Sequence, residues 1–136
     1  MTRPSAAATR AARRLWARDA ADPGTPGEVA ADAERVTGDV RTRLIVWIGS
    51  EGYHLLLQRA LTQAGDAQPA LHALSSDHGH VRGIPEAVRA HGPAKVADGI
   101  GAMLAALIDR LGRVVGAEMA ERLVEPARGT EGVRDG

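Results

Sequence analysis

The sequence predicts an all-α protein: a small helical bundle of about five helices with a pseudo-two-fold internal repeat. A pattern that reads R-L-x-x-apolar-apolar-G-small-E begins at Arg43 and again at Arg110. Each copy reads as a long helix, a glycine stop (Gly49 or Gly116) and a short helix. Apolar residues before both glycines recur at helical spacing. The sequence also has no Phe, one Tyr and two Trp, so its core must be mainly aliphatic.

The chain of 136 residues has the length of one domain. Residues 1–27 are rich in Ala and Arg and end in Asp-Pro-Gly-Thr-Pro-Gly, which breaks helices. We expect this segment to be a flexible basic N-terminal arm, in which residues 6–20 could form a short helix. The bundle is predicted to span residues 28–127. Residues 128–136 are polar and rich in glycine, and they predict a flexible C-terminal tail.

The first long helix is predicted from about Glu28 to Ile48, because its apolar residues form one stripe. Gly49 should end this helix, and Ser50 should cap a second helix that runs to about Ala64. A shorter helix is predicted from residue 66 or 67 to about residue 76. Residues 77–83 contain no periodic pattern and are expected to form a polar loop, which a short helix over 85–90 follows.

The strongest helical pattern spans residues 94–115, where apolar residues are separated by one, three or four positions. Gly116 should end this helix, and a last helix is predicted over residues 117–125, before Pro126. We expect the two long helices, 28–48 and 94–115, to pack together at the centre of the bundle.

The repeat also suggests a pair of ionic contacts. Arg43 matches Arg110, and Glu51 matches Glu118. In a two-fold arrangement Arg43 could reach Glu118 while Arg110 reaches Glu51. The alternative is that both glutamates favour the N-termini of their helices and both arginines lie in solvated last turns.

Charge and composition argue against several classes of function. Lys and Arg together number 17, as do Asp and Glu, so no cationic excess points to nucleic-acid binding. Cysteine is absent, which excludes disulfides and thiolate chemistry. No apolar run is long enough to span a membrane, and the N-terminus lacks the pattern of a secretory signal. We therefore expect a cytoplasmic protein that binds neither nucleic acid nor membrane.

No constellation of residues points to catalysis or to a cofactor. The sequence has no G-x-S-x-G motif, no phosphate loop and no H-E-x-x-H motif. A histidine phosphotransfer domain is also helical, but the residues after His54 are apolar and do not match such a site. A helix-turn-helix lacks its basic recognition helix here. We expect no enzymatic activity and no cofactor.

The histidine loop offers the one local metal candidate. Asp77, His78 and His80 are ligand types that Zn²⁺ or Ni²⁺ accepts, and His72 lies one helix away. Their spacing matches no metal motif, so we expect a solvated polar loop and no metal site, with these residues as the weak candidates.

The leading hypothesis is a small bacterial, non-catalytic interaction or scaffold module that docks a protein partner, or itself as a homodimer. The expected contact face is the apolar stretch of Tyr53, Leu55 and Leu57. The N-terminal arm would add Arg13, Arg14 and Trp16. The alternative is a small-molecule or metal-binding sensor, with residues 77–80 over a pocket between the long helices.

Overall fold

The computed structural model describes residues 3–125 and is mostly helical. Five α-helices are α1 (Ala6–Leu15), α2 (Pro26–Gly65), α3 (Ile84–His91), α4 (Pro93–Val115) and α5 (Ala117–Val124). A 3₁₀ helix, η1 (Pro69–Ala73), leads into an antiparallel hairpin of β1 (Ser75–Asp77) and β2 (His80–Arg82). The prediction of a helical bundle is confirmed in its coarse form, and the small sheet is an addition to it.

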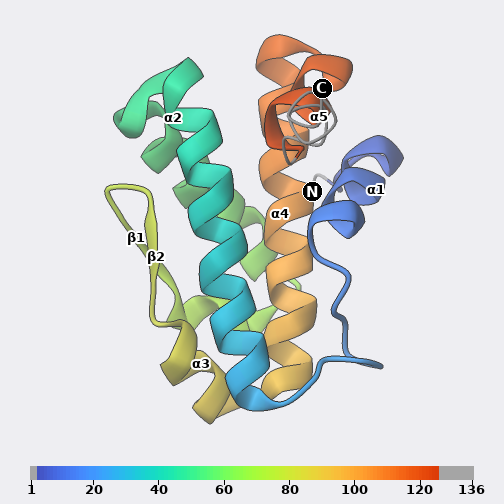
Figure 1. Ribbon diagram of the computed structural model, residues 1–136, viewed down its shortest axis with the longest axis vertical. Helices are drawn as coiled ribbons and strands as arrows, with labels where there is room; N and C mark the ends of the chain where they lie inside the picture. The colour runs from blue at the N-terminus through green and yellow to red at the C-terminus, as the bar shows by residue number, and fades with distance from the viewer. Residues whose placement is uncertain (1–2, 126–136) are drawn as a thin grey trace, which may run out of the picture.

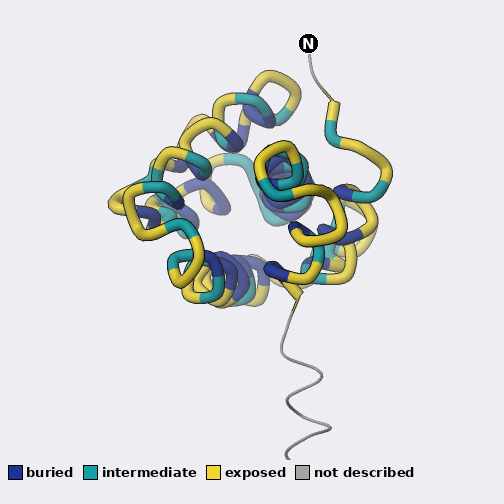
Figure 2. The backbone as a smooth tube through the Cα atoms, turned by 90° about the horizontal axis from the view of Figure 1, so that it is seen from above, coloured by how far each residue is buried: buried dark blue, intermediate teal, exposed yellow. Residues whose placement is uncertain are grey.

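The two long helices form the centre of the bundle, as expected. Figure 1 shows α2 and α4 side by side, with the hairpin and α3 beside α2 and with α1 beside α4. Seen along the bundle, buried residues face the inside of the ring of helices (Figure 2). The core is aliphatic apart from Tyr53 and Trp16, which are 1% and 5% exposed.

Helix α2 changes direction at Gly49, where the sequence predicts a stop. Gly49 has φ 79° and ψ 163°, a conformation inside α2 that is not helical. Residues with a Cβ atom rarely adopt it, because the side chain collides with the backbone. The helix thus has an N-terminal part before Gly49 and a C-terminal part after it. The N-terminal part begins at Pro26, because Thr25 and Glu28 form a reciprocal capping box.

Gly116 separates α4 from α5 with nearly the same backbone conformation, φ 94° and ψ 149°. This likeness agrees with the repeated sequence. However, Gly92 between α3 and α4 also has φ 90° and ψ 157°, although it lies outside the repeat. The shared glycine conformation is therefore not specific to the repeat, and the internal two-fold symmetry stays a prediction.

The expected polar loop at 77–83 is instead part of the hairpin. Asp77 pairs with His80, so His78 and Gly79 form a two-residue turn. Both have positive φ, 54° and 90°, as a type I′ turn requires. Asn-Gly is the usual sequence of such a turn, and His-Gly is a weaker signal. The preceding segment also departs from prediction, since the expected helix over 66–76 is only the short η1.

The N-terminal segment packs against the bundle instead of standing apart as an arm. Helix α1 begins after Ser5, whose Oγ accepts a hydrogen bond from the Ala8 backbone, and lies against α4. Its buried face is made of alanines, which allow close approach between helices. Trp16 follows the helix and donates from Nε1 to the Ala97 carbonyl at 2.8 Å. The two large apolar residues of this segment, Leu15 and Trp16, do not by themselves predict its order, because the alanine contact with α4 is not visible in local sequence.

Candidate functional site

Four large apolar side chains are exposed at one end of the bundle. Val46 and Trp47, just before Gly49, are 79% and 65% exposed. Val114, just before Gly116, is 78% exposed, and Met119 on α5 is 42% exposed. The turns at Gly49 and Gly116 lie at the same end of the molecule, at the top of Figure 1. These four side chains are called the corner surface below.

Two arginines cross between the halves of the bundle just below this surface. Arg43 donates from Nη1 to the Val124 carbonyl of α5 at 2.8 Å. Arg110 of α4 donates from Nε to Gln63 Oε1, in the C-terminal part of α2, at 2.8 Å. Each arginine thus reaches the short helix of the other copy of the repeat.

These contacts place the exposed apolar residues relative to one another. Residues four apart on a helix lie on the same face, one turn apart. Trp47 therefore lies one turn beyond Arg43, on the side of α2 that faces α5. Val114 likewise lies one turn beyond Arg110, on the side of α4 that faces the C-terminal part of α2. Both side chains therefore lie at the end of the bundle that carries the two glycine turns.

The ionic pairs that the repeat suggested as one of two alternatives do not form. In the described residues Arg43 and Arg110 bond Val124 and Gln63, and no ion pair joins either arginine to Glu118 or Glu51. Both glutamates are exposed in the first turns after the two glycines. The crosswise geometry of the arginines is present, but a carbonyl and an amide take the place of the carboxylates.

The predicted face of Tyr53, Leu55 and Leu57 does not exist as a surface. Tyr53 and Leu57 are 1% and 0% exposed and belong to the core, whereas Leu55 is 49% exposed. Residues four apart share a helix face and residues two apart do not, so Leu55 must point away from the other two. Burial also raises the pKa of the Tyr53 hydroxyl well above its ordinary value, although the nearby Arg41 charge opposes this.

The residues predicted to act from the N-terminal arm have different surroundings. Arg13 is exposed. Arg14 lies 3.4 Å from Glu121 and 3.5 Å from Glu125, so it ties α1 to the region of α5. Trp16 is buried against α4 and is unavailable to a partner in this conformation. The exposed tryptophan is Trp47, although it belongs to the apolar stripe of residues 28–48, which was expected to face the centre of the bundle.

The hairpin carries the predicted metal candidates, but they do not converge. Asp77 Oδ2 lies 3.3 Å from an Arg82 nitrogen, and His78 is 86% exposed. Within residues 3–125 no group of three or more His, Asp or Glu side chains could hold a metal ion.

A contact that the sequence did not suggest fixes the hairpin to α2. Ser76 Oγ lies 2.7 Å from His54 Nδ1 and accepts a hydrogen bond from the Gly79 backbone at 3.1 Å. The serine hydroxyl and the histidine ring therefore serve to hold the turn against the helix. This contact joins residues 22 positions apart, so no local sequence pattern could reveal it.

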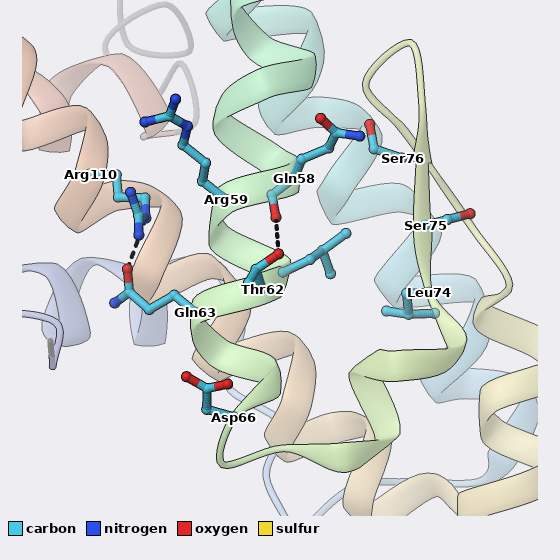
Figure 3. A pocket seen from close by; sticks show the side chains of 10 residues that line it. Gln58, Arg59, Thr62, Gln63, Asp66, Leu74, Ser75, Ser76 and Arg110 are labelled. Carbon is cyan, nitrogen blue, oxygen red and sulfur yellow. Dashed lines mark hydrogen bonds between the residues drawn. The ribbon is translucent and has the colours of Figure 1, made fainter. Parts of the chain in front are cut away.

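A polar hollow of about 790 Å³ lies beside this contact (Figure 3). The C-terminal part of α2 contributes Gln58, Arg59, Thr62 and Gln63, among others, and β1 contributes Ser75 and Ser76. Arg110 reaches its edge from α4, where it bonds Gln63 (Figure 3). The hollow is a concave surface beside one helix. It does not lie between the two long helices, where the sequence argument expected a pocket.

A local signal for the corner surface is present in the sequence. Both copies of the repeat have two consecutive apolar residues before glycine, Trp47-Ile48 and Val114-Val115. Adjacent side chains on a helix point about 100° apart, so a narrow buried face cannot accept both fully. In the structure Ile48 and Val115 pack against the core, and Trp47 and Val114 remain exposed.

Comparison with known proteins adds no family or relative: no family model, no curated protein and no solved structure matches this chain. Across the described residues, none of the helices combines the length and the apolar character that crossing a membrane would need.

Proposed function

We propose that this chain is a non-catalytic interaction module that docks a protein partner, or a second copy of itself, through the corner surface. The observation that carries the proposal is the gathering of Val46, Trp47, Val114 and Met119 in exposed positions at one end of the bundle. Contiguous apolar groups on the surface of a folded domain commonly mark interaction sites.

The chemistry of these side chains suits docking. Burying a side chain the size of Val or Met contributes roughly 1.5–3 kcal/mol, and tryptophan is among the residues most enriched at interface hot spots. The two glycine turns and the crossing arginines fix the backbone beneath the surface, which lowers the entropy cost of ordering it on binding. The internal repeat remains part of the proposal, because Trp47 and Val114 occupy the same position in its two copies.

Site-specific photocrosslinking in the cells that produce the protein tests this proposal. A benzophenone amino acid replaces Val46, and the matched control replaces Lys95, an exposed residue at the start of α4 and the opposite end of the bundle. We expect a discrete protein adduct from position 46 and none from position 95. No adduct at position 46, or the same adducts at both positions, would contradict the proposal.

The polar hollow favours a second function, the binding of a small polar molecule. Two arginines, Arg59 and Arg110, border it together with amides, hydroxyls and one carboxylate, Asp66. The arginines, amides and hydroxyls are donors that suit a carboxylate or phosphate group. Titration of ¹⁵N-labelled protein with citrate and with inorganic phosphate tests this alternative. Shifts confined to the hollow and abolished by Arg110→Gln would support it, and shifts absent at millimolar ligand would reject it.

A further inference from the structure

We infer that Ser76 is an activated nucleophile, a serine that His54 prepares to accept an acyl group from a small activated ester in the polar hollow. The acceptance of one acyl group per chain goes beyond the docking proposed above, and it uses a different part of the molecule. The hollow and the corner surface share no described residue.

The contact that holds the hairpin to α2 also pairs a nucleophile with a base. Ser76 Oγ lies 2.7 Å from His54 Nδ1 and accepts a hydrogen bond from the Gly79 backbone at 3.1 Å. A hydroxyl group has one proton to donate and two positions at which it accepts. With Gly79 at one of these positions, the serine proton points to His54 Nδ1 in the tautomer that carries its hydrogen on Nε2. One lone pair of the oxygen is then left to attack a carbonyl carbon.

The hollow gives a small molecule access to this serine. Ser76 is half-buried and borders the hollow of about 790 Å³. A serine that served only to fasten the turn would need no open space beside its oxygen. Its neighbour Ser75 borders the same hollow and is exposed, so it provides a matched comparison within the same strand.

Gln58 supplies a donor for the negative charge that develops during acyl transfer. It lies four residues after His54, so the two side chains share a face of α2, one turn apart. Gln58 borders the hollow, and Figure 3 shows its amide end directed toward Ser76. Side-chain amides of this kind stabilise the oxyanion of a tetrahedral intermediate. Nucleophile, base and oxyanion donor thus meet where β1 faces the C-terminal part of α2.

The reaction transfers one acyl group and involves no oxidation or reduction. Ser76 Oγ attacks the carbonyl carbon of the ester, and its proton passes to His54 Nδ1. The resulting oxyanion, beside the Gln58 amide, re-forms its C=O bond and expels the leaving oxygen, which takes the proton from His54. The products are an ester of Ser76 and a free alcohol or phenol. Esters with a stable leaving group, such as phenyl esters, should react fastest, because expulsion of that group then needs least assistance.

Acetylation of the full-length protein by 4-nitrophenyl acetate tests the inference, with the modified positions located by mass spectrometry. We expect Ser76 to be acetylated at least about tenfold faster than Ser75, because only Ser76 is paired with a base. His54→Gln should lower the rate at Ser76 to that at Ser75. The rate at the amine of Lys95, an exposed residue of α4, should not change and serves as the internal reference. Equal rates at the two serines, or a rate at Ser76 that His54→Gln does not change, would overturn the inference.

A thiol at each position separates activation by His54 from a purely structural role. Because the sequence has no cysteine, Ser76→Cys and Ser75→Cys each carry a single thiol, whose alkylation by iodoacetamide is measured against pH. We expect Ser76→Cys to react at least about tenfold faster near neutral pH, since a neighbouring imidazole favours the thiolate, while Ser75→Cys follows the ordinary thiol pKa of about 8.5. Circular dichroism should show that both variants are folded. The same pH profile for both thiols would contradict the inference, and the crosslinking result at position 46 would stand independently of it.

Discussion

The guanidinium group of Arg43 donates a hydrogen bond to the main-chain carbonyl of Val124, 2.8 Å away and 81 residues later in the chain. Val124 is the last residue of α5, where carbonyl groups lack partners within the helix. Arg43 thus supplies a charged donor to the end of a short helix and joins α2 to α5.

Replacing Arg43 should therefore loosen α5 more than any other helix. We expect Arg43→Met to lower the free energy of unfolding by about 1–2 kcal/mol, since the variant keeps an apolar stem and loses the charged donor. Hydrogen exchange should become faster in residues 117–124. Arg35→Met is the matched control, because Arg35 is exposed and makes only local contacts on α2. Equal effects of the two changes on α5 would contradict the capping role.

Truncation of the two tryptophans should change the stability of the fold by very different amounts. Trp16→Ala removes a buried ring and its bond to Ala97, so it should cost about 3–5 kcal/mol in chemical denaturation or release α1. Trp47→Ala truncates a side chain that is 65% exposed, and at a concentration where the protein is monomeric it should change stability by less than about 0.5 kcal/mol. A larger cost for Trp47 than for Trp16 would mean that their burial is reversed.

Replacing Gly49, at the bend of α2, should destabilise the fold because of its backbone conformation and not because of a steric clash. A Cβ atom added at Gly49 would meet no atom within 4 Å, yet φ is 79° there. We expect Gly49→Ala to destabilise the fold by about 1–3 kcal/mol in thermal or urea unfolding. Gly38→Ala, also with open space but within regular helix, should stabilise it by about 0.5–1 kcal/mol. If Gly49→Ala and Gly38→Ala changed the stability in the same direction, the backbone conformation at Gly49 would not be the cause.

The contact between Arg18 and Asp32 should make stability depend on acid pH. Arg18 Nε lies 2.9 Å from Asp32 Oδ2, and the hydrogen bond holds the pKa of that carboxyl below its ordinary value of 3.8. A carboxyl group whose pKa is lower in the folded than in the unfolded state stabilises the fold at pH values above its unfolded-state pKa. This contribution disappears as the pH falls through the folded-state pKa. The wild type should thus exceed Asp32→Asn by on the order of 0.5–1 kcal/mol near neutral pH.

Urea unfolding of both proteins from pH 7 down to about pH 2 measures this difference, which should shrink below about pH 4. Asp39→Asn is the control, since the Asp39 side chain is 52% exposed and lies as far as 4.0 Å from the nearest arginine nitrogen. A difference that grows as the pH falls would have the wrong sign for this ion pair.

Local sequence was sufficient for the two long helices and their interruptions, but not for residues 66–76, where the predicted helix is only the short η1. The apolar periodicity of residues 94–115 predicts α4, because a helix must place one face against the core whatever lies opposite. Gly49 and Gly116 predict the bends, because only glycine readily adopts their backbone conformation. The type I′ turn at His78-Gly79 was missed, because its chemistry is atypical and its fastening to His54 comes from another element.

The candidate site depended on partners that are distant in sequence. Periodicity shows which residues share a helix face, but not how wide the covered part of that face is. Tyr53 and Leu57 became core because η1, the hairpin and α4 pack around the C-terminal part of α2, while Trp47 extends past the end of that packing.

The sequence by itself thus determined the helices, the glycine bends and the aliphatic core, since each follows from backbone preferences and short-range spacing. Only the tertiary structure decided which tryptophan is buried, that α1 joins the bundle, and that Arg43 and Arg110 cross to opposite halves. Those outcomes depend on which surfaces meet. Burial of a side chain is a property of the neighbours that cover it, and those neighbours lie tens of residues away.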